Sequence, residues 1–148
     1  MRNRAKLQIH LDALVWHMRV ARRRHTMPFA ELVRSVEGPL RPAAVSPVPV
    51  ERLYAALGRA RRFWPGRRSC LLDSLAAVGL FREHGHDARL AIGVRAARPE
   101  IDAHAWVVVE GRTFGQGAAG YAPLRASDSA IQAAAAVACS EPSRTDNE

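Results

Sequence analysis

The chain has 148 residues, the length of one ordinary domain, and its 48% hydrophobic content allows a packed core and argues against disorder. The formal charge of +8 comes almost entirely from arginine and favours acidic partners, but no recognised nucleic-acid-binding motif accompanies it. No apolar run is long enough to span a bilayer, no secretory signal opens the chain, and two cysteines are too few for a disulfide framework. A cytoplasmic protein without a membrane span is therefore expected.

The first half of the sequence predicts helices. Apolar residues recur at helical spacing over 7–20, which predicts an amphipathic helix. Its apolar positions are Leu7, Leu11, Leu14, Val15 and Met18. A second helix is predicted over 28–38, and a third over 50–63. Between them, the four prolines of 39–49 predict a linker.

A helix from Cys70 to about Glu83 opens the second half. Ser69 can cap its start and Gly85 can end it. Apolar residues cover most of its circumference, so the helix is expected to be central and buried.

Three strands are predicted after that helix, over 88–94, 103–109 and 112–115, with a tight turn at 110–111. A weak, alanine-rich helix is predicted over 127–138. Helices followed by an antiparallel meander predict an α+β fold. The expected division is a helical N-terminal region with a proline-rich linker (1–48), a core (49–139) and a disordered tail (140–148).

Cys70 and His104 are the candidate catalytic pair. A helix N-terminus favours the thiolate form of cysteine, and its backbone N–H groups can hold an oxyanion. A histidine on an adjacent strand would take the thiol proton and return it to the leaving amine. Taken alone, a cysteine in an apolar helix is more often a small core residue.

The sequence motifs around these residues are more specific than a cysteine and a histidine alone. The segments CLLDSLAAVGLFREHGHDARLAIGVR (70–95) and AHAWVVVEG (103–111) resemble the lasso-peptide leader peptidases of the transglutaminase-like superfamily, which are papain-type cysteine enzymes. The matching words are Cys70-Leu71, Ser74-Leu75-Ala76, Gly85 to Val94, His104 to Val107 and Tyr121-Ala122-Pro123-Leu124. The resemblance spans about residues 60 to 125.

The resemblance implies a papain/transglutaminase-like core, with a central cysteine-bearing helix packed on an antiparallel sheet that carries the histidine. It implies removal of the leader from a lasso precursor peptide, after which an ATP-dependent lasso cyclase closes the ring. Because 148 residues leave no room for a leader-binding domain, a separate leader-recognition protein is the expected partner. Neither a cofactor nor a metal ion is implied.

The third catalytic residue stays open. The family places an aspartate on the strand after the His-Ala-Trp-Val hairpin, where this sequence has Gln116 between two glycines. Asp102 is the alternative, because it lies two residues before His104 on the same strand face. A two-residue turn at 110–111 would pair residue 104 with 117 and turn Gln116 to the wrong face, whereas a shift of one residue would bring it opposite His104.

Two further residues are candidates for substrate binding. Trp106 shares the face of His104, so it could wall a substrate cleft or simply pack in the core. Asp73, one turn after Cys70, could contact substrate or be solvated. The histidines His10, His17, His84 and His86 are expected on the surface rather than at a metal.

Three other functions remain open from the sequence. The same fold could carry another acyl-transfer activity, such as a transglutaminase or an amidase. The missing acid also allows a catalytically impaired relative that acts as an interaction module. A basic nucleic-acid-binding protein is disfavoured because the arginines are scattered rather than gathered in one stripe.

Overall fold

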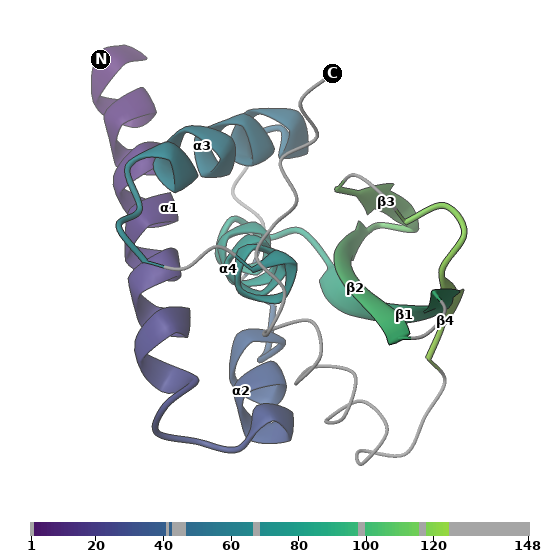
Figure 1. Ribbon diagram of the computed structural model, residues 1–148. Coiled ribbons are helices and arrows are strands. Elements are labelled where there is room, and N and C mark those ends of the chain that lie inside the picture. The colour runs from purple at the N-terminus through teal and green to yellow at the C-terminus, as the bar shows by residue number, and fades with distance from the viewer. Residues whose placement is uncertain are drawn as a thin grey trace.

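Helices make up the first half of the fold and a small sheet the second (Figure 1). The computed structural model describes residues 2–40, 42, 47–66, 69–97, 100–115 and 118–124. The helices in this part of the chain are α1 (Arg2–Arg23), α2 (Phe29–Val36), α3 (Val50–Arg62) and α4 (Cys70–Glu83). Its strands are β1 (Ala88–Ala97), β2 (Glu100–Val109), β3 (Arg112–Phe114) and β4 (Ala122–Pro123). The predicted α+β class is confirmed.

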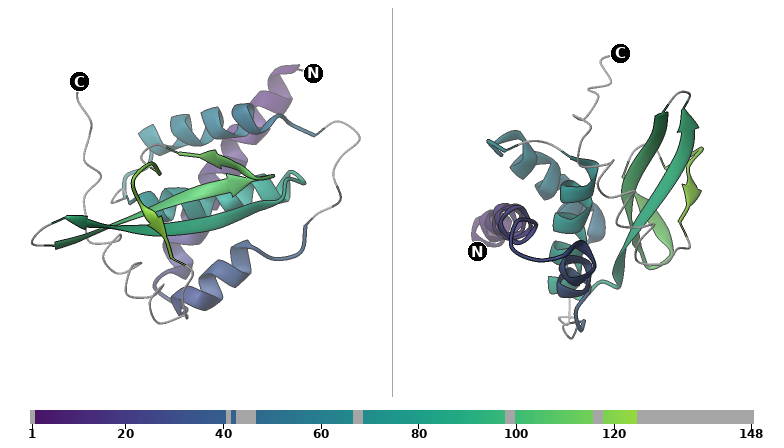
Figure 2. Two further views of the ribbon diagram at one scale, coloured as in Figure 1. Left: turned by 90° about the vertical axis from the view of Figure 1, so that its right-hand side faces the viewer. Right: turned by 60° about the horizontal axis from the view of Figure 1, so that its bottom comes forward.

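Helix α4 is the centre of the fold. The other three helices pack against it from one side, and the curled sheet covers the other side (Figures 1 and 2). Ten of its fourteen residues are buried, which explains why no polar face was visible in its sequence. Each fully buried leucine or phenylalanine, such as Leu75 or Phe81, contributes about 1.5–3 kcal/mol from burial. Gly79 lets α1 approach closely, since a Cβ there would overlap the ring of Trp16.

Both ends of α4 are formed as the sequence predicts. The Ser69 hydroxyl accepts a hydrogen bond from the Leu72 amide at 3.3 Å, which is an N-cap. At the other end Gly85 has φ +87°, and the amide after it, of His86, donates to the Phe81 carbonyl at 3.0 Å. This is a Schellman ending, which requires a residue that tolerates positive φ.

Helix α1 buries a different face from the one its apolar pattern highlights. The residues that pack into the core are Ile9, Ala13, His17 and Val20. The large apolar side chains left exposed are Leu7, Leu11 and Met18, at 62%, 46% and 47% exposure. The helix itself is confirmed, but its most regular apolar stripe points away from the protein core.

The sheet is antiparallel, with strand order β3-β2-β1-β4. Glu110 and Gly111 have φ +50° and +79°, and Val109 pairs with Arg112, so the β2–β3 connection is the predicted two-residue turn. Strands β1 and β2 extend beyond the predicted ranges because their ladder continues through polar pairs such as Arg95 with Asp102. Strand β4 was not predicted.

The register sorts the residues of β1 and β2 onto two faces. The face toward α4 carries Ala88, Leu90, Ile92, Val94, Ala103, Ala105, Val107 and Val109. The opposite face carries Gly93, Arg95, Asp102, His104 and Trp106. Side chains alternate along a strand. The apolar residues of β2 therefore pack against the core, and the residues between them place polar and aromatic side chains on the opposite face.

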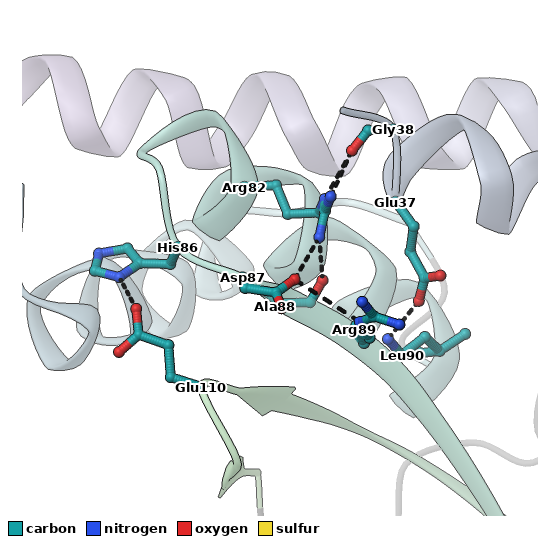
Figure 3. Close-up of polar contacts among 9 residues, drawn as sticks. All are labelled: Glu37, Gly38, Arg82, His86, Asp87, Ala88, Arg89, Leu90 and Glu110. Carbon is teal, nitrogen blue, oxygen red and sulfur yellow. Dashed lines mark hydrogen bonds and ion pairs between the residues drawn. The ribbon is translucent and has the colours of Figure 1, made fainter. Parts of the chain in front are cut away.

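Arg82 fastens the last turn of α4 to two other segments (Figure 3). Its guanidinium donates to the Gly38 carbonyl from two nitrogens, at 3.0 and 2.6 Å. It also donates to the Ala88 carbonyl at 3.1 Å and to Asp87 at 2.9 Å. This single side chain therefore joins the segment after α2, the end of α4 and the start of β1.

Some predictions fall on residues outside the described ranges. These are the helix over 127–138, the tail over 140–148 and the position of Gln116. The division into 1–48 and 49–139 stays a prediction. Among the described residues, no helix is both long and apolar enough to cross a membrane.

Candidate active site

Cys70 is the first residue of α4 and is half-buried, packed against the hydrophobic core. The Ser69 cap satisfies the Leu72 amide and sets the direction in which the helix starts. The first-turn amides and the helix dipole make this position favourable for an anion, and hence for a thiolate.

A hydrogen bond ties the first turns of α4 to the edge of β2. Ser74, one turn after Cys70, is buried and its hydroxyl donates to the Ala105 carbonyl at 3.0 Å. Ala105 is the residue after His104. The start of α4 and the His104 segment of β2 are therefore held side by side.

The sheet register explains why the Ala105 carbonyl is available for this bond. Its partner across the ladder, Ile92, uses its own carbonyl to accept from the Leu124 amide on the β4 side. Ile92 and Ala105 thus form a non-hydrogen-bonded pair, in which the backbone N–H and C=O groups of the two residues point away from each other, toward opposite edges of the two-strand ladder. The Ala105 carbonyl therefore faces the β3 edge, where β3 pairs only with 107–109 and leaves room for Ser74.

His104 is half-buried in an aromatic setting. Its ring stacks on Trp106, with centroids 6.1 Å apart and planes 23° apart, and lies 5.2 Å from the Tyr121 ring. Gly93, opposite His104 in the ladder, makes room for this cluster. A Cβ at Gly93 would lie 2.7 Å from Trp106 and 2.9 Å from Tyr121. The spacing of His104 and Trp106 on one face is as predicted.

Asp102 is bonded to residues on two neighbouring strand segments. It pairs with Arg95 at 2.5 Å and accepts a hydrogen bond from the Tyr121 hydroxyl at 2.5 Å. The Arg95 guanidinium lies over the Tyr121 ring, 4.7 Å from its centroid. The hydrogen bond to Asp102 is the main cause that raises the pKa of Arg95 above its ordinary value. Tyr121 therefore contacts both Asp102 and His104.

Gln116, the other candidate for the third residue, lies outside the described residues. The β2–β3 ladder has the register of a two-residue turn through Val107 and Phe114. The one-residue shift that would bring position 116 opposite His104 is absent over 107–114.

Asp73 makes contacts with side chains of two other helices. Its carboxylate lies 3.4 Å from His17 Nε2 and accepts from Arg61 at 3.1 Å. His17 Nδ1 lies 2.9 Å from the Ala13 carbonyl, and its ring lies 6.1 Å from that of Trp64. These contacts brace the first turn of α4 against α1, α3 and the segment that leads to Cys70.

The expectation of surface histidines is wrong for His17 and His86, which are only 6% and 8% exposed. His86 lies 3.2 Å from Glu110 and 2.8 Å from the Val48 carbonyl (Figure 3 shows the first of these contacts). Within the described part of the chain, no group of three or more His, Cys, Asp or Glu side chains is arranged to hold a metal ion.

Sequence reasoning gave no role to Tyr121, Arg95 or Ser74. Tyr121 was noted only as part of the motif Tyr121-Ala122-Pro123-Leu124. The pairing of Arg95 with Asp102 could have been found by extending the hairpin ladder past its apolar residues. The bond of Ser74 to Ala105 has no sequence signal, because it depends on where α4 meets the sheet.

A family model described as the transglutaminase-like superfamily matches residues 10–127. The chain therefore belongs to the transglutaminase-like superfamily, which includes cysteine acyltransferases and peptidases. The match extends over α1 and α2 as well as α4 and the sheet. No curated protein and no solved structure matches the chain significantly.

Proposed function

We propose that this chain is a cysteine peptidase in which Cys70 is the nucleophile and His104 the general base. The observation that carries the proposal is the Ser74–Ala105 hydrogen bond, which holds the start of α4 beside the His104 segment in a member of the transglutaminase-like superfamily. A capped helix start and a half-buried imidazole are what such a thiol mechanism needs.

The reaction would proceed in two stages. His104 accepts the thiol proton, the Cys70 sulfur attacks the scissile carbonyl, and first-turn amides of α4 hold the oxyanion. The C–N bond then breaks as His104 gives its proton to the leaving amine, which leaves a thioester on Cys70. Water, deprotonated by His104, hydrolyses the thioester and restores the thiol.

For the residue that orients His104, the described contacts favour Asp102. Its carboxylate is fixed by Arg95 and by the Tyr121 hydroxyl, while the Tyr121 ring packs on the imidazole. An orienting group limits the rotation of the imidazole and stabilises its charged form. Gln116 stays the second candidate.

The proposed substrate is a ribosomally made lasso precursor peptide, whose leader the enzyme removes. This rests on the resemblance of segments 70–95 and 103–111 to the leader peptidases. A separate leader-recognition protein would present the precursor, and an ATP-dependent lasso cyclase would use the freed N-terminus. The purified chain alone is accordingly expected to cleave the precursor weakly or not at all.

Mass spectrometry of the precursor, incubated with the chain and the leader-recognition protein, tests the proposal. Cys70→Ala should abolish leader removal, about 10⁴-fold or more, without loss of the fold. Cys139→Ala, a change at the other cysteine, is the matched control and should cleave normally. Cleavage that persists in Cys70→Ala would refute the thiol mechanism.

The nature of the product separates peptidase from transferase. With an added primary amine such as dansylcadaverine, a leader peptidase yields free leader and core peptide. A transglutaminase would instead yield an amine-labelled peptide, and an amidase would release ammonia. Either of these two results would replace the peptidase assignment while keeping Cys70 as nucleophile.

A further inference from the structure

The outer side of α1 carries an apolar stripe of four residues, three of which are exposed in the described structure, while the fourth, Leu14, packs against the edge of the core. Leu7, Leu11, Leu14 and Met18 are spaced by four, three and four residues. Leu7, Leu11 and Met18 are 62%, 46% and 47% exposed, and Leu14 is half-buried. Alternating spacings of three and four residues define the narrow seam of helix-to-helix packing, not a broad apolar face.

A basic groove runs beside this stripe, between α1 and α3. It has a volume of about 380 Å³. Its residues are Lys6, Ile9, His10, Arg52, Ala56 and Arg59. Ile9 and Ala56 are buried and form an apolar floor, while cationic side chains form the walls. His10 lies three residues after Leu7 and four before Leu14, and such residues are neighbours on a helix surface, so the groove and the stripe adjoin. Together they are here called the α1/α3 surface.

A hydrogen-bond chain fixes part of the groove wall. Arg59 Nε donates to His10 Nε2 at 2.7 Å, which requires that His10 carry its proton on Nδ1. That Nδ1 lies 2.6 Å from the Lys6 carbonyl, as a donor should. The guanidinium of Arg59 is therefore positioned before any partner arrives, which lowers the entropic cost of binding a carboxylate.

The charges of the two helices select the kind of partner. Helix α1 carries six basic residues and one acidic residue, and α3 carries four and one. A second copy of the chain would bring two strongly basic surfaces together, and like-charge contacts disfavour association. The single acid of α3, Glu51, is already paired with Arg112. Charge complementarity thus calls for an acidic partner.

We infer that the α1/α3 surface docks an amphipathic helix of a partner protein, with an apolar seam on the Leu7–Met18 stripe and carboxylates in the basic groove. That this partner delivers the peptide substrate rests on the proposed function. The position fits delivery, because His10 and His17 are seven residues, or about 10 Å, apart on α1, and His17 contacts Asp73 in the first turn of α4. Three or four extended residues would span that distance.

A labelled synthetic helix tests the docking surface directly. The probe is a fluorescein-labelled peptide as long as α1, with leucine at seam positions and glutamate at the flanking positions. Fluorescence anisotropy should show that the full chain binds it at least about tenfold more tightly than an otherwise identical lysine-flanked peptide. Equal binding of the two peptides would overturn the charge argument.

Matched substitutions locate the binding. Leu11→Gln should weaken binding of the glutamate-flanked peptide about tenfold, whereas Leu40→Gln, at a residue of similar exposure (43%), should not. Arg59→Gln should weaken it about fivefold, and Arg34→Gln, an exposed arginine on α2, should not. Circular dichroism and thermal unfolding establish that each variant is folded. Equal losses in test and control variants would overturn the assignment of the surface.

Three other results would show that something else occupies this surface, and each would overturn the inference. These are a dimer by sedimentation that Leu11→Gln dissociates, binding to phosphatidylserine vesicles that Leu11→Gln abolishes, and tighter binding of duplex DNA than of the acidic peptide. All variants are also tested for alkylation of Cys70 by iodoacetamide, which should be unchanged. Peptide binding with no leader removal would leave the docking surface intact and reject only the proposed function.

Discussion

The two ends of α4 are held in different ways. At the C-terminal end, Arg82 donates four hydrogen bonds to acceptors on two other segments, and its side chain is only 11% exposed (Figure 3). At the N-terminal end, the helix is held by a serine cap, the Ser74–Ala105 bond and the Asp73 contacts, all placed around a half-buried Cys70. The C-terminal end is bonded to neighbouring segments, here called the anchor, whereas the contacts at the N-terminal end surround the proposed nucleophile.

The two outer sides of the β1–β2 hairpin differ in a similar way. Past the end of β4, the Leu90 amide of β1 donates to the Glu37 carboxylate at 2.8 Å (Figure 3). Past the end of β3, the Ala105 carbonyl of β2 accepts from Ser74. Both contacts satisfy a backbone group that a longer neighbouring strand would have paired. The first involves Glu37, whose neighbour Gly38 is bonded to Arg82 at the C-terminal end of α4, and the second adjoins His104.

If this comparison is right, changes at one end should remove chemistry and changes at the other should remove stability. The largest effect is expected for His104→Ala, which should slow leader removal about 10³-fold while the fold survives. The wild-type thiol should react with iodoacetamide well below pH 8.5, where an ordinary cysteine is protonated, and the variant should not. His25→Ala, at an exposed histidine, is the control. An unchanged thiol titration in His104→Ala would break the proposed pairing with Cys70.

Arg82→Ala tests the anchor. Removing a largely buried guanidinium leaves two carbonyls and Asp87 without this donor, so the free energy of unfolding should fall by about 3 kcal/mol. Arg89→Ala also removes a partner of Asp87, but its side chain is 73% exposed and it should cost less than about 1 kcal/mol. Chemical denaturation measures both. Equal losses of unfolding free energy would mean that Arg82 stabilises the fold no more than the exposed Arg89 does.

Asp102→Asn sharpens the assignment of the orienting residue. Leader removal should fall about tenfold or more, since the carboxylate bonded to Arg95 and Tyr121 would lose its charge. Tyr121→Phe should have a smaller effect in the same direction, because it removes only the hydroxyl bond. If Gln116→Ala is damaging and both of these variants turn over normally, Gln116 is the orienting residue. Normal turnover in all three would indicate a Cys–His dyad.

The smallest effect is expected at the N-cap of α4. Ser69→Ala removes the acceptor of the Leu72 amide and should destabilise the protein by about 1 kcal/mol. Ser35→Ala, which removes a bond to the Leu32 carbonyl on half-exposed α2, is the control and should cost less. Because Ser69 adjoins Cys70, its loss should also slow thiol alkylation. A stability loss with unchanged alkylation would show that the cap supports only the fold.

Local features of the chain were predictable. The helix from Cys70 to Glu83 was predicted with both of its ends, because a capping serine and a positive-φ glycine act on the backbone within a few residues. The two-residue turn at Glu110-Gly111 was predicted for the same reason. The choice of Cys70 and His104 as the catalytic pair rests on residue type and on the neighbouring sequence motifs, and it stays a prediction.

Burial and long-range bonding were decided by the tertiary structure. The spacing of Leu7, Leu11 and Met18 predicts a helix but not which face another element will cover, and the side of α1 that α3 and α4 cover is the one with Ile9 and Ala13. The burial of His17 depends in the same way on what packs over it, and the bonds of Arg82 to Gly38 and of Ser74 to Ala105 join residues 44 and 31 positions apart. Local propensity extends over a few residues, whereas a buried donor and its acceptor are chosen by how whole helices and strands pack.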